Sequence, residues 1–453
     1  MLLRFVNNWF APRCNPIGVD FGTDCLRMAQ VQWVGTEHKL VAAATADVPM
    51  HVRNNPAARM EFFVDTTRDL LAQSDFRGRQ AILGLPAAWM HVQHLRLPKM
   101  DEDTLRKSLP WETRGKLPID PSQALIRHLI AGDIYQDQDP RDEVIVLAAA
   151  REAVNRLLSC AARVKLDVIG MNIEPSAILD CFSYVYRRKA DADTVNCFID
   201  IGSAATRAVV TCGQRILFAR VIPVGGDHFS KAVSTALGIG LEDAKTLRIK
   251  LAHGQPSLDE HRERQEIVAK PTESANAPAG DEEDGGGGFA LLTAGIRASE
   301  RQAETVTTPE ALSKPVDRGP LYVPSTSETP SQAATIAAAC AEPLSKLVHE
   351  LDLCRRYHES TFPNKPIARL VFVGGEARQR MLCQSIAQQL GVAAQVGDPL
   401  VRMGRISEVS IESGIDRRQP QPSWAVAIGL SMGPISPTAE LSDRAAVTAQ
   451  AKA

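Results

Sequence analysis

The sequence predicts an α/β protein built from two related halves that close on a phosphorylated ligand, and three short segments carry this prediction. Two of them share one pattern, an apolar strand followed by Asp, one apolar residue, Gly and a hydroxyl residue; they occupy residues 17–23 and 198–203. The third, residues 370–376, is an apolar strand that runs into a pair of glycines. Two copies of one pattern in a single chain indicate internal duplication, with the ligand held between the halves.

Each copy predicts a β-hairpin whose turn can approach phosphate groups. A glycine turn lets backbone N–H groups reach phosphate oxygens, and a hydroxyl side chain adds another donor. An Asp at the end of the strand can hold Mg²⁺ or its waters. The candidates are Asp20, Gly22 and Thr23 in the first hairpin, and Asp200, Gly202 and Ser203 in the second.

Two glycine pairs extend the candidate site. Gly374 and Gly375 stand where a predicted strand meets a helical stretch over residues 377–390. Glycines at such a junction permit close backbone approach to a ligand, and a tight turn without a ligand is the alternative. Gly225 and Gly226 are expected to turn the chain under the phosphates, and the following Asp227 also suits a helix N-terminus.

The bulk properties exclude several classes of protein. A chain of 453 residues exceeds one compact core and favours two lobes or several subdomains. Its formal net charge of -2 argues against a general nucleic-acid-binding surface. The nine cysteines form no C-x-x-C pair, which is typical of free thiols in a reducing compartment. No stretch approaches the roughly 18 apolar residues of a membrane span.

Composition and hydrophobic pattern divide the chain into regions. Residues 255–332 combine an acidic run, four consecutive glycines and few aromatic residues, so they predict a disordered insertion. The N-terminal segment is amphipathic, and it either touches a membrane surface or packs on the protein itself. The expected regions are an N-terminal amphipathic segment (1–15), a first-lobe core (16–79 and 166–192), an inserted α+β subdomain (80–165), a second lobe (193–254 and 333–433), the disordered insertion (255–332) and a flexible tail (434–453).

An ordered series of short motifs resembles the PilM family, the actin-like proteins of type IV pilus assembly. The two Asp hairpins and the glycine pair occur in the order of the two phosphate motifs and the adenosine motif of the actin-like ATPase superfamily. The match covers about residues 16–250 and 335–432. Its motifs include Leu85-Pro86, Leu97-Pro98-Lys99-Met100, Trp111-Glu112, Leu117-Pro118-Ile119, Ile173-Glu174-Pro175 and the run 218–227.

The resemblance implies an actin-like two-lobed ATPase fold, with the insertion at the position it has in the cell-division protein FtsA. It also implies ATP and Mg²⁺ as cofactors, with Asp20 and Asp200 holding the ion through water and Gly374 and Gly375 lying against the adenosine. The implied partner is a PilN-like bitopic inner-membrane protein, whose N-terminal peptide would dock beside residues 80–165. Further platform and motor proteins, and a cytoplasmic location at the inner membrane, are also expected; self-association stays open.

One departure bears on catalysis. Relatives commonly carry Ala-Glu-x-x-Lys on the helix after Gly225-Gly226, whereas this chain has Ala244-Lys245-Thr246-Leu247-Arg248. Arg248 keeps the positive charge, but the Lys245 ammonium cannot accept a hydrogen bond from ribose hydroxyls. Apart from the two aspartates, which are assigned to position water, no general base stands out. We therefore expect a nucleotide-binding scaffold with slow or no hydrolysis.

Three alternatives remain. An actin-fold small-molecule kinase would share the hairpins but needs a catalytic Asp in a polar substrate pocket, which the pattern of the insertion does not offer. An FtsA-like filament-forming protein would end in a basic amphipathic helix, whereas residues 441–453 are rich in Ala and weakly amphipathic. A type II secretion platform component usually carries a membrane span in continuity with this fold.

Overall fold

The computed structural model describes residues 14–35, 37–136, 139–186, 191, 193–254, 332–405 and 414–433. The predicted N-terminal segment, the insertion and the tail therefore lie almost wholly outside the described residues. The chain divides into two compact units, one made of Met1–Phe229 with Glu342–Ala453 and the other of Ser230–Ala341. The domain boundaries given above stay predictions.

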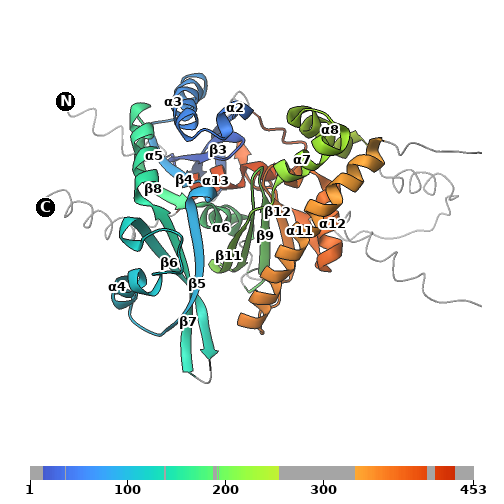
Figure 1. Cartoon of the computed structure of the whole chain (residues 1–453). Helices are drawn as coiled ribbons and strands as arrows, with labels where there is room; N and C mark the ends of the chain where they lie inside the picture. Colours follow the sequence, from blue (N-terminus) through green and yellow to red (C-terminus); the bar gives the residue numbers. More distant parts are fainter. Residues whose placement is uncertain are drawn as a thin grey trace, which may run out of the picture. The chain divides into compact units, whose positions relative to one another are not determined.

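Three sheets form the framework of the first unit (Figure 1), which confirms the α/β class. The first sheet has the order β14-β3-β2-β1-β4-β8, the second β11-β10-β9-β12-β13, and the third β5-β7-β6. The strands of the first sheet are β1 (Ile17–Phe21), β2 (Cys25–Val34), β3 (Glu37–Asp47), β4 (Gln80–Leu85), β8 (Asp167–Ile173) and β14 (Gly404–Arg405). In both large sheets an antiparallel hairpin is continued by parallel strands. This repeated topology matches the internal duplication read from the sequence.

Helices cover one face of the first sheet. α3 (Pro56–Gln73) begins at Asn55, whose side chain accepts from the N–H groups of Ala57 and Ala58, and Pro56 fits the first turn because its missing N–H is not needed there. The short α2 (Met50–Arg53) precedes it, and α5 (Arg151–Arg163) packs beside it. Phe63 from α3 and Leu157 from α5 enter one apolar cluster with residues of β1 and β4.

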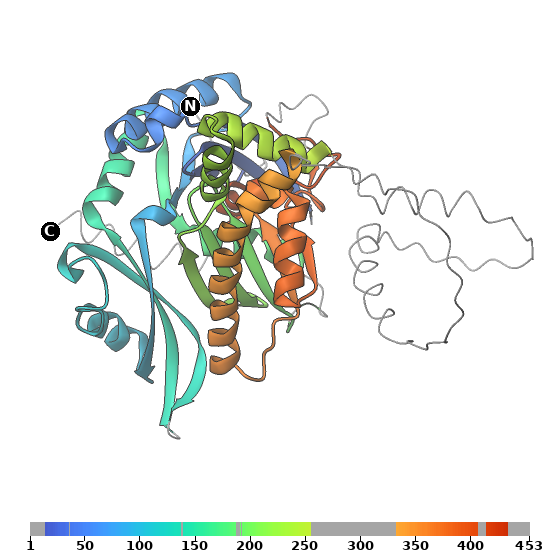
Figure 2. The same cartoon turned by 45° about the vertical axis from the view of Figure 1, so that its right-hand side comes forward.

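The second sheet consists of β9 (Val195–Ile201), β10 (Thr206–Cys212), β11 (Arg215–Ile222), β12 (Arg369–Val373) and β13 (Ala394–Val396). Helix α12 (Arg380–Leu390) joins β12 to β13, as a parallel pair requires. From Glu342 onward, α11 (Gln332–Thr361) runs beside this sheet in both views (Figures 1 and 2), and its Tyr357 packs on Phe218 of β11.

Two helices lie between the large sheets, and glycines allow their close packing. These are α6 (Glu174–Val185) and α13 (Ala425–Met432). A Cβ on Gly429 of α13 would lie 1.8 Å from the Ala177 carbonyl oxygen of α6, and a Cβ on Gly18 of β1 would lie 2.1 Å from the Ala427 carbonyl oxygen. The start of β1, which leads to Asp20, is thereby fixed against α13.

The third sheet belongs to the insertion between β4 and β8. It contains β5 (Met90–Pro98), β6 (Ala124–Gln136) and β7 (Asp139–Ala150), with α4 (Glu102–Glu112) packed against it through Leu105 and Leu109. The sequence predicts a short helix here that is capped by Asp101 and ended by Pro110; the cap is confirmed, but the predicted end is wrong. The helix continues to Glu112, because a proline this close to the end removes only one late backbone bond.

The second unit is a small helical assembly. It contains α8 (Leu241–Gly254) and parts of α7 (Gly226–Leu237) and α11, both of which continue into the first unit. Its apolar cluster is formed by Val233, Ala244 and Ile336. Across the described ranges, no helix has the length and hydrophobicity needed to span a bilayer.

Candidate functional site

The two predicted hairpins repeat one arrangement of charges. Asp20 on β1 stands opposite Arg27 on β2, and Asp200 on β9 stands opposite Arg207 on β10. In both cases the arginine follows the aspartate by seven positions. Both aspartates are buried. A buried carboxylate needs a cation or strong donors, and each hairpin brings an arginine to the strand facing its own aspartate.

Arg207 is the best-connected member of this set. Its Nη1 lies 3.2 Å from Oδ2 of Asp200, and its Nε and Nη2 lie 2.6 and 2.8 Å from the two carboxylate oxygens of Glu174. Glu174 is the first residue of α6, so Arg207 joins the second hairpin to a helix that lies between the sheets. The fork of the guanidinium suits this geometry, because it can pair with two carboxylates at once.

Burial dominates the electrostatics of the cluster. It raises the pKa of Asp20 to about 6, while Arg27 and Arg207 act to lower it and Asp200 and Asp24 act to raise it. Asp20 thus feels charges of both hairpins, which lie within electrostatic reach of each other. Burial also raises the pKa of Glu174, against the opposing effect of Arg207.

The turn of the second hairpin packs against the Gly225–Gly226 pair. The N–H of Gly226 donates to the Gly202 carbonyl at 2.9 Å, and that of Asp227 donates to the Ser203 carbonyl at 2.8 Å. A Cβ on Gly225 would lie 2.5 Å from the Ser203 carbonyl oxygen, so only glycine permits this contact. The structure therefore brings four of the predicted residues together at one turn.

Ser203 supplies a direct sign of an incomplete site. Its Oγ is buried, and within the described part of the chain it has no hydrogen-bond partner. Buried hydroxyls are normally satisfied, and each exception calls for an explanation. A phosphate oxygen at this turn would supply the missing acceptor.

Gly374 and Gly375 have different surroundings. Gly374 has φ +89°, and a Cβ there would lie 2.3 Å from Oδ1 of Asp200, so the end of β12 rests directly on that carboxylate. A Cβ on Gly375 would meet nothing within 4 Å. One glycine therefore closes the chain over Asp200, and the other borders open space.

The first hairpin turn is held by an arginine from α3. Arg59 donates to the carbonyls of Gly22 and Thr23 at 3.0 and 2.9 Å, and its guanidinium lies 4.6 Å from the centre of the Phe21 ring. The last predicted residue, Arg248, lies in the second unit, where it is buried and donates to Ser230 Oγ at 3.2–3.3 Å.

Sequence reasoning missed Arg207, Glu174 and Arg59 as members of the site. A signal existed for Arg207, because the seven-residue spacing from Asp to Arg is repeated in both hairpins. Glu174 stood out only as part of a motif, and Arg59 gave no signal. Their contacts depend on how α6 and α3 pack.

The donor set fits a water-mediated divalent cation. Arg207 already pairs with Oδ2 of Asp200, and the end of β12 at Gly374 lies close to Oδ1, so little room is left for an ion to bind this carboxylate directly. Nowhere in the described ranges do three or more His, Cys, Asp or Glu residues gather as metal ligands.

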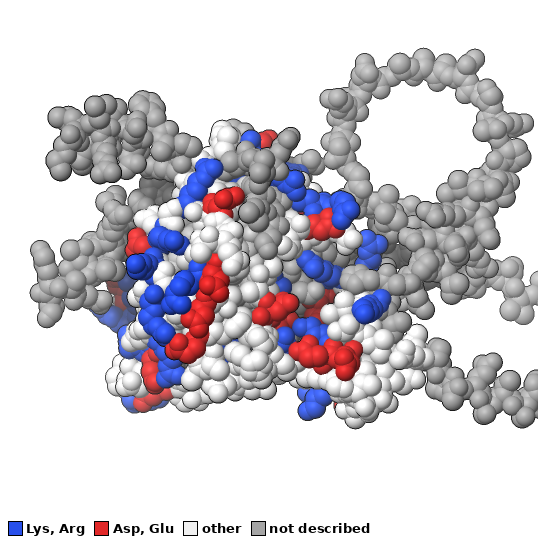
Figure 3. All heavy atoms as spheres, turned by 90° about the horizontal axis from the view of Figure 1, so that it is seen from above, with Lys and Arg blue, Asp and Glu red and all other residues white. Residues whose placement is uncertain are grey.

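A concave site lies at the insertion. A pocket of about 300 Å³ is lined by β5, by the segment after α4 and by β11: Met90, His91, Val92, Gln93, Lys116, Leu117, Pro118, Arg220 and Val221. Both β5 and β11 are the outermost strands of their sheets. We call this pocket the β5–β11 slot. On the face shown in Figure 3, basic and acidic side chains are intermixed and form no large patch of one sign.

The chain is similar to two known protein families. Residues 18–257 match the family model described as type IV pilus assembly protein PilM, and residues 197–429 match that of cell division protein FtsA. Two curated relatives are FtsA of Bacillus subtilis (strain 168), 24% identical over 111 residues, and FtsA of Rhizobium meliloti (strain 1021), 29% identical over 127 residues. These alignments cover 24% and 28% of this chain, and 24% and 27% of the relatives. The chain thus spans about a quarter of their length.

A solved structure extends the likeness to 93% of this chain. A chain of a PilM-PilN type IV pilus biogenesis complex superposes with a TM-score of 0.64 and 18% identity, over 93% of this chain and 98% of that chain. At this identity the match shows a common fold. The predicted actin-like fold is confirmed.

Proposed function

Because this chain belongs to the type IV pilus assembly protein PilM family, we propose that it is an ATP-binding scaffold of the inner-membrane pilus assembly platform. Its proposed protein partner is a PilN-like bitopic membrane protein, and the chain binds the N-terminal cytoplasmic peptide of that protein. The observation that carries the proposal is the superposition on 98% of a chain of the PilM-PilN complex. The resemblance to PilM read from the sequence is confirmed, and its finer consequences are the content of this proposal.

The nucleotide lies at the two hairpins. Ser203 Oγ, the turn at Gly22 and the turn at Gly202 face its phosphates, and the adenosine lies beside Gly375, where the backbone borders open space. Mg²⁺ neutralises phosphate charge and is held through water by Asp20 and Asp200. Arg207 fixes the carboxylate of Asp200 in one orientation, since it anchors that group to Glu174.

Turnover is slow or absent in this proposal. A general base must reach the attacking water, yet Asp200 and Glu174 are both bound to Arg207. Asp20 is the one carboxylate among the three for which no such ion pair is found in the described structure. A site that binds phosphates but offers one weakly placed base suits a nucleotide-dependent scaffold.

The peptide docks in the β5–β11 slot. An extended peptide gains affinity by pairing its backbone with an outer strand, and pockets select alternate side chains. The slot lies beside the predicted insertion and presents Lys116 together with Arg220, which also pairs with Glu350 at 2.8 Å. This polar rim suits a peptide that carries an acidic group.

The PilM match favours this function over that of FtsA. The FtsA match begins at residue 197, so it leaves out the insertion, whereas the PilM match over residues 18–257 includes it. The insertion carries one wall of the slot. We place the protein in the cytoplasm, peripheral to the inner membrane through its partner, with other platform and motor proteins as further partners and without nucleic acid.

Titration calorimetry tests the nucleotide site. Wild type, Asp20→Ala and Asp200→Ala are titrated with ATP in the presence of Mg²⁺, and each substitution should weaken binding because the ion loses an anionic partner. Lys99→Ala is the control, because its ion pair with Asp133 is exposed and lies in the insertion. Unchanged affinity in both Asp variants would refute the site.

A further inference from the structure

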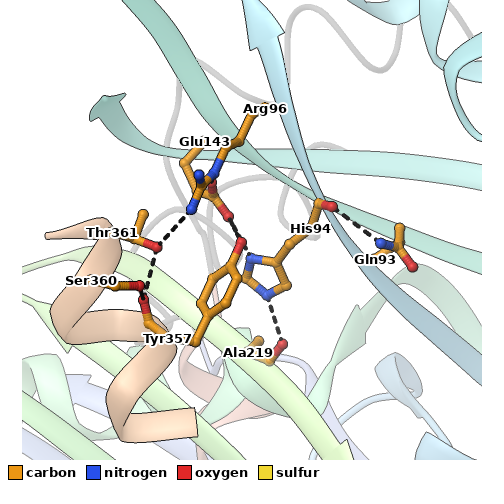
Figure 4. A network of polar contacts seen from close by, with 8 residues as sticks. All are labelled: Gln93, His94, Arg96, Glu143, Ala219, Tyr357, Ser360 and Thr361. Atoms are coloured by element: carbon orange, nitrogen blue, oxygen red, sulfur yellow. Dashed lines mark hydrogen bonds and ion pairs between the residues drawn. The ribbon is translucent and has the colours of Figure 1, made fainter. Parts of the chain in front are cut away.

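Figure 4 shows a network of polar contacts centred on a buried carboxylate. Its centre is Glu143 of β7, whose side chain is 0% exposed. Three side chains converge on the carboxylate: Tyr357 donates its O–H at 2.6 Å, His94 Nδ1 lies at 2.9 Å, and Arg96 Nε lies at 3.4 Å. We call these four residues the Glu143 clamp.

The clamp fastens the insertion to the second sheet and its helix. His94 and Arg96 come from β5, whereas Tyr357 comes from α11. His94 Nε2 lies 3.0 Å from the Ala219 carbonyl oxygen of β11, and Arg96 also donates to Thr361 Oγ1 at 3.4 Å. The contacts at Tyr357, Ala219 and Thr361 join the insertion to β11 and α11, whereas His94 and Arg96 meet Glu143 within the insertion.

Aromatic packing makes the arrangement rigid. The His94 ring stacks on Phe218 with centroids 4.8 Å apart and meets Tyr357 at 5.3 Å, while Phe218 and Tyr357 lie 5.5 Å apart. Rings in such mutual contact cannot turn independently. The hydrogen bonds of His94 therefore have one orientation.

Hydrogen-bond chemistry fixes the role of Nε2 in His94. The Ala219 carbonyl can only accept, so Nε2 carries a hydrogen. The contact at Nδ1 then places one more hydrogen between His94 and Glu143, on the ring or on the carboxyl group. The bridge from β5 to β11 thus depends on the carboxyl group of β7.

The clamp adjoins the slot on both strands. Gln93 lines the slot and His94 belongs to the clamp, and on β11 Arg220 lines the slot while Ala219 accepts from His94. The distance between β5 and β11 at this end is therefore set by the His94–Ala219 contact. A peptide lying between the two strands would meet a slot of fixed width.

Stability alone gives little reason for such a cluster. Taking a carboxylate out of water is costly, and apolar residues of similar volume often hold an interface as well or better. Buried charged groups are best understood where they fix one arrangement among several. The position of the cluster beside the slot supplies such a role.

We propose that the Glu143 clamp positions β5 and β11 for the partner peptide, so that His94, Glu143 and Tyr357 determine peptide affinity without touching the peptide. This inference rests on the proposed function, because it takes the extended PilN-like peptide as the occupant of the slot. The clamp residues are positioning residues. Their loss lets the two strands change their separation and weakens the pairing of the peptide with both.

The test uses the full chain and a fluorescently labelled peptide, the cytoplasmic N-terminus of the PilN-like protein from the same genome. Peptide Kd is measured by anisotropy at 20 °C for wild type, Tyr357→Phe and Glu143→Gln, beside thermal melts of each. Both variants should raise Kd, by about tenfold if one buried charged hydrogen bond is lost from the arrangement. Tyr357→Phe removes one hydroxyl and keeps the ring packing, so this variant alone still tests the clamp if Glu143→Gln does not fold.

Two controls separate positioning from stability. Tyr135→Phe alters a tyrosine of the insertion that is 79% exposed, and should change neither Kd nor melting temperature. Phe63→Leu lowers the melting temperature through the cluster under α3, away from the slot, and should leave Kd unchanged. A clamp variant that melts earlier but keeps the wild-type Kd would overturn the positioning role and leave the proposed partner in place. Absence of peptide binding in wild type would overturn the proposed partner and the clamp inference together.

Discussion

Replacing Arg207 by Met should destabilise the protein strongly, because two buried carboxylates lose their shared cation. The side chains of Arg207, Glu174 and Asp200 are 12%, 5% and 7% exposed, so water cannot take over the lost contacts at 3.2, 2.6 and 2.8 Å. Removing one partner of a buried ion pair costs about 3–5 kcal/mol. Since two carboxylates are left here, we expect the upper part of that range.

The assay is thermal and urea unfolding followed by circular dichroism at pH 7. At about 2 °C per kcal/mol for a large domain, the upper part of that range lowers the melting temperature by roughly 8–10 °C. The double variant Arg207→Met/Glu174→Gln should recover about half of the loss, because one of the two uncompensated charges is gone.

Arg163→Met is the matched control. Arg163 makes a bidentate pair with Glu61, but both side chains are about half exposed, and such pairs contribute about 1 kcal/mol or less. Its melting temperature should stay within about 2 °C of wild type. An Arg207→Met protein that melts as close to wild type as the control would refute the account of Arg207 as the cation that compensates the buried site.

Further predictions concern single groups. Ser203→Ala should keep stability and weaken ATP binding about fivefold by calorimetry, since the buried hydroxyl has no protein partner within the described structure; tighter or equal binding would contradict its role. Gly429→Ala should lower the free energy of unfolding, measured by urea titration, by about 1–3 kcal/mol or more because its Cβ meets the Ala177 carbonyl, whereas Gly375→Ala should keep that free energy and reduce ATP affinity. Burial raises the pKa of Asp180 to about 7, so its contribution to stability is full below about pH 4 and is lost as the pH rises through 7. Urea midpoints measured from pH 4 to 8 should therefore fall less in Asp180→Asn than in wild type, and parallel curves would show that Asp180 does not titrate in this window.

The parts of the fold predicted from sequence are those fixed by local chemistry. The pattern around Asp20 and Asp200 predicted two hairpins because strand alternation and a glycine turn are properties of neighbouring residues. The glycines at 225 and 226 could be placed at a turn for the same reason. The error at Pro110 arose because a proline removes only its own backbone hydrogen bond, to the residue four positions earlier, and the last residues of a helix can follow it.

The parts that escaped prediction depend on packing between distant segments. Glu174 reaches Arg207 because α6 starts where β8 ends, and Glu143 meets Tyr357 across 214 positions of sequence. A buried Glu within an alternating strand resembles any outward-facing Glu until the neighbouring sheet is known. The β5–β11 slot escaped prediction for the same reason, because its two strands belong to different sheets and lie far apart in the sequence.

The insertion has two kinds of attachment with different mechanical properties. Its chain enters from β4 and leaves through α5 to β8, so its covalent connections run to the first sheet, while the Glu143 clamp binds it to β11 and α11. If one large sheet turns against the other, the insertion cannot follow both. Its motion would be shared between bending at the two chain crossings and breakage at the clamp. Covalent connections bend without breaking, so a turn too large for the clamp would leave the insertion travelling with the first sheet, and β5 and β11 would part.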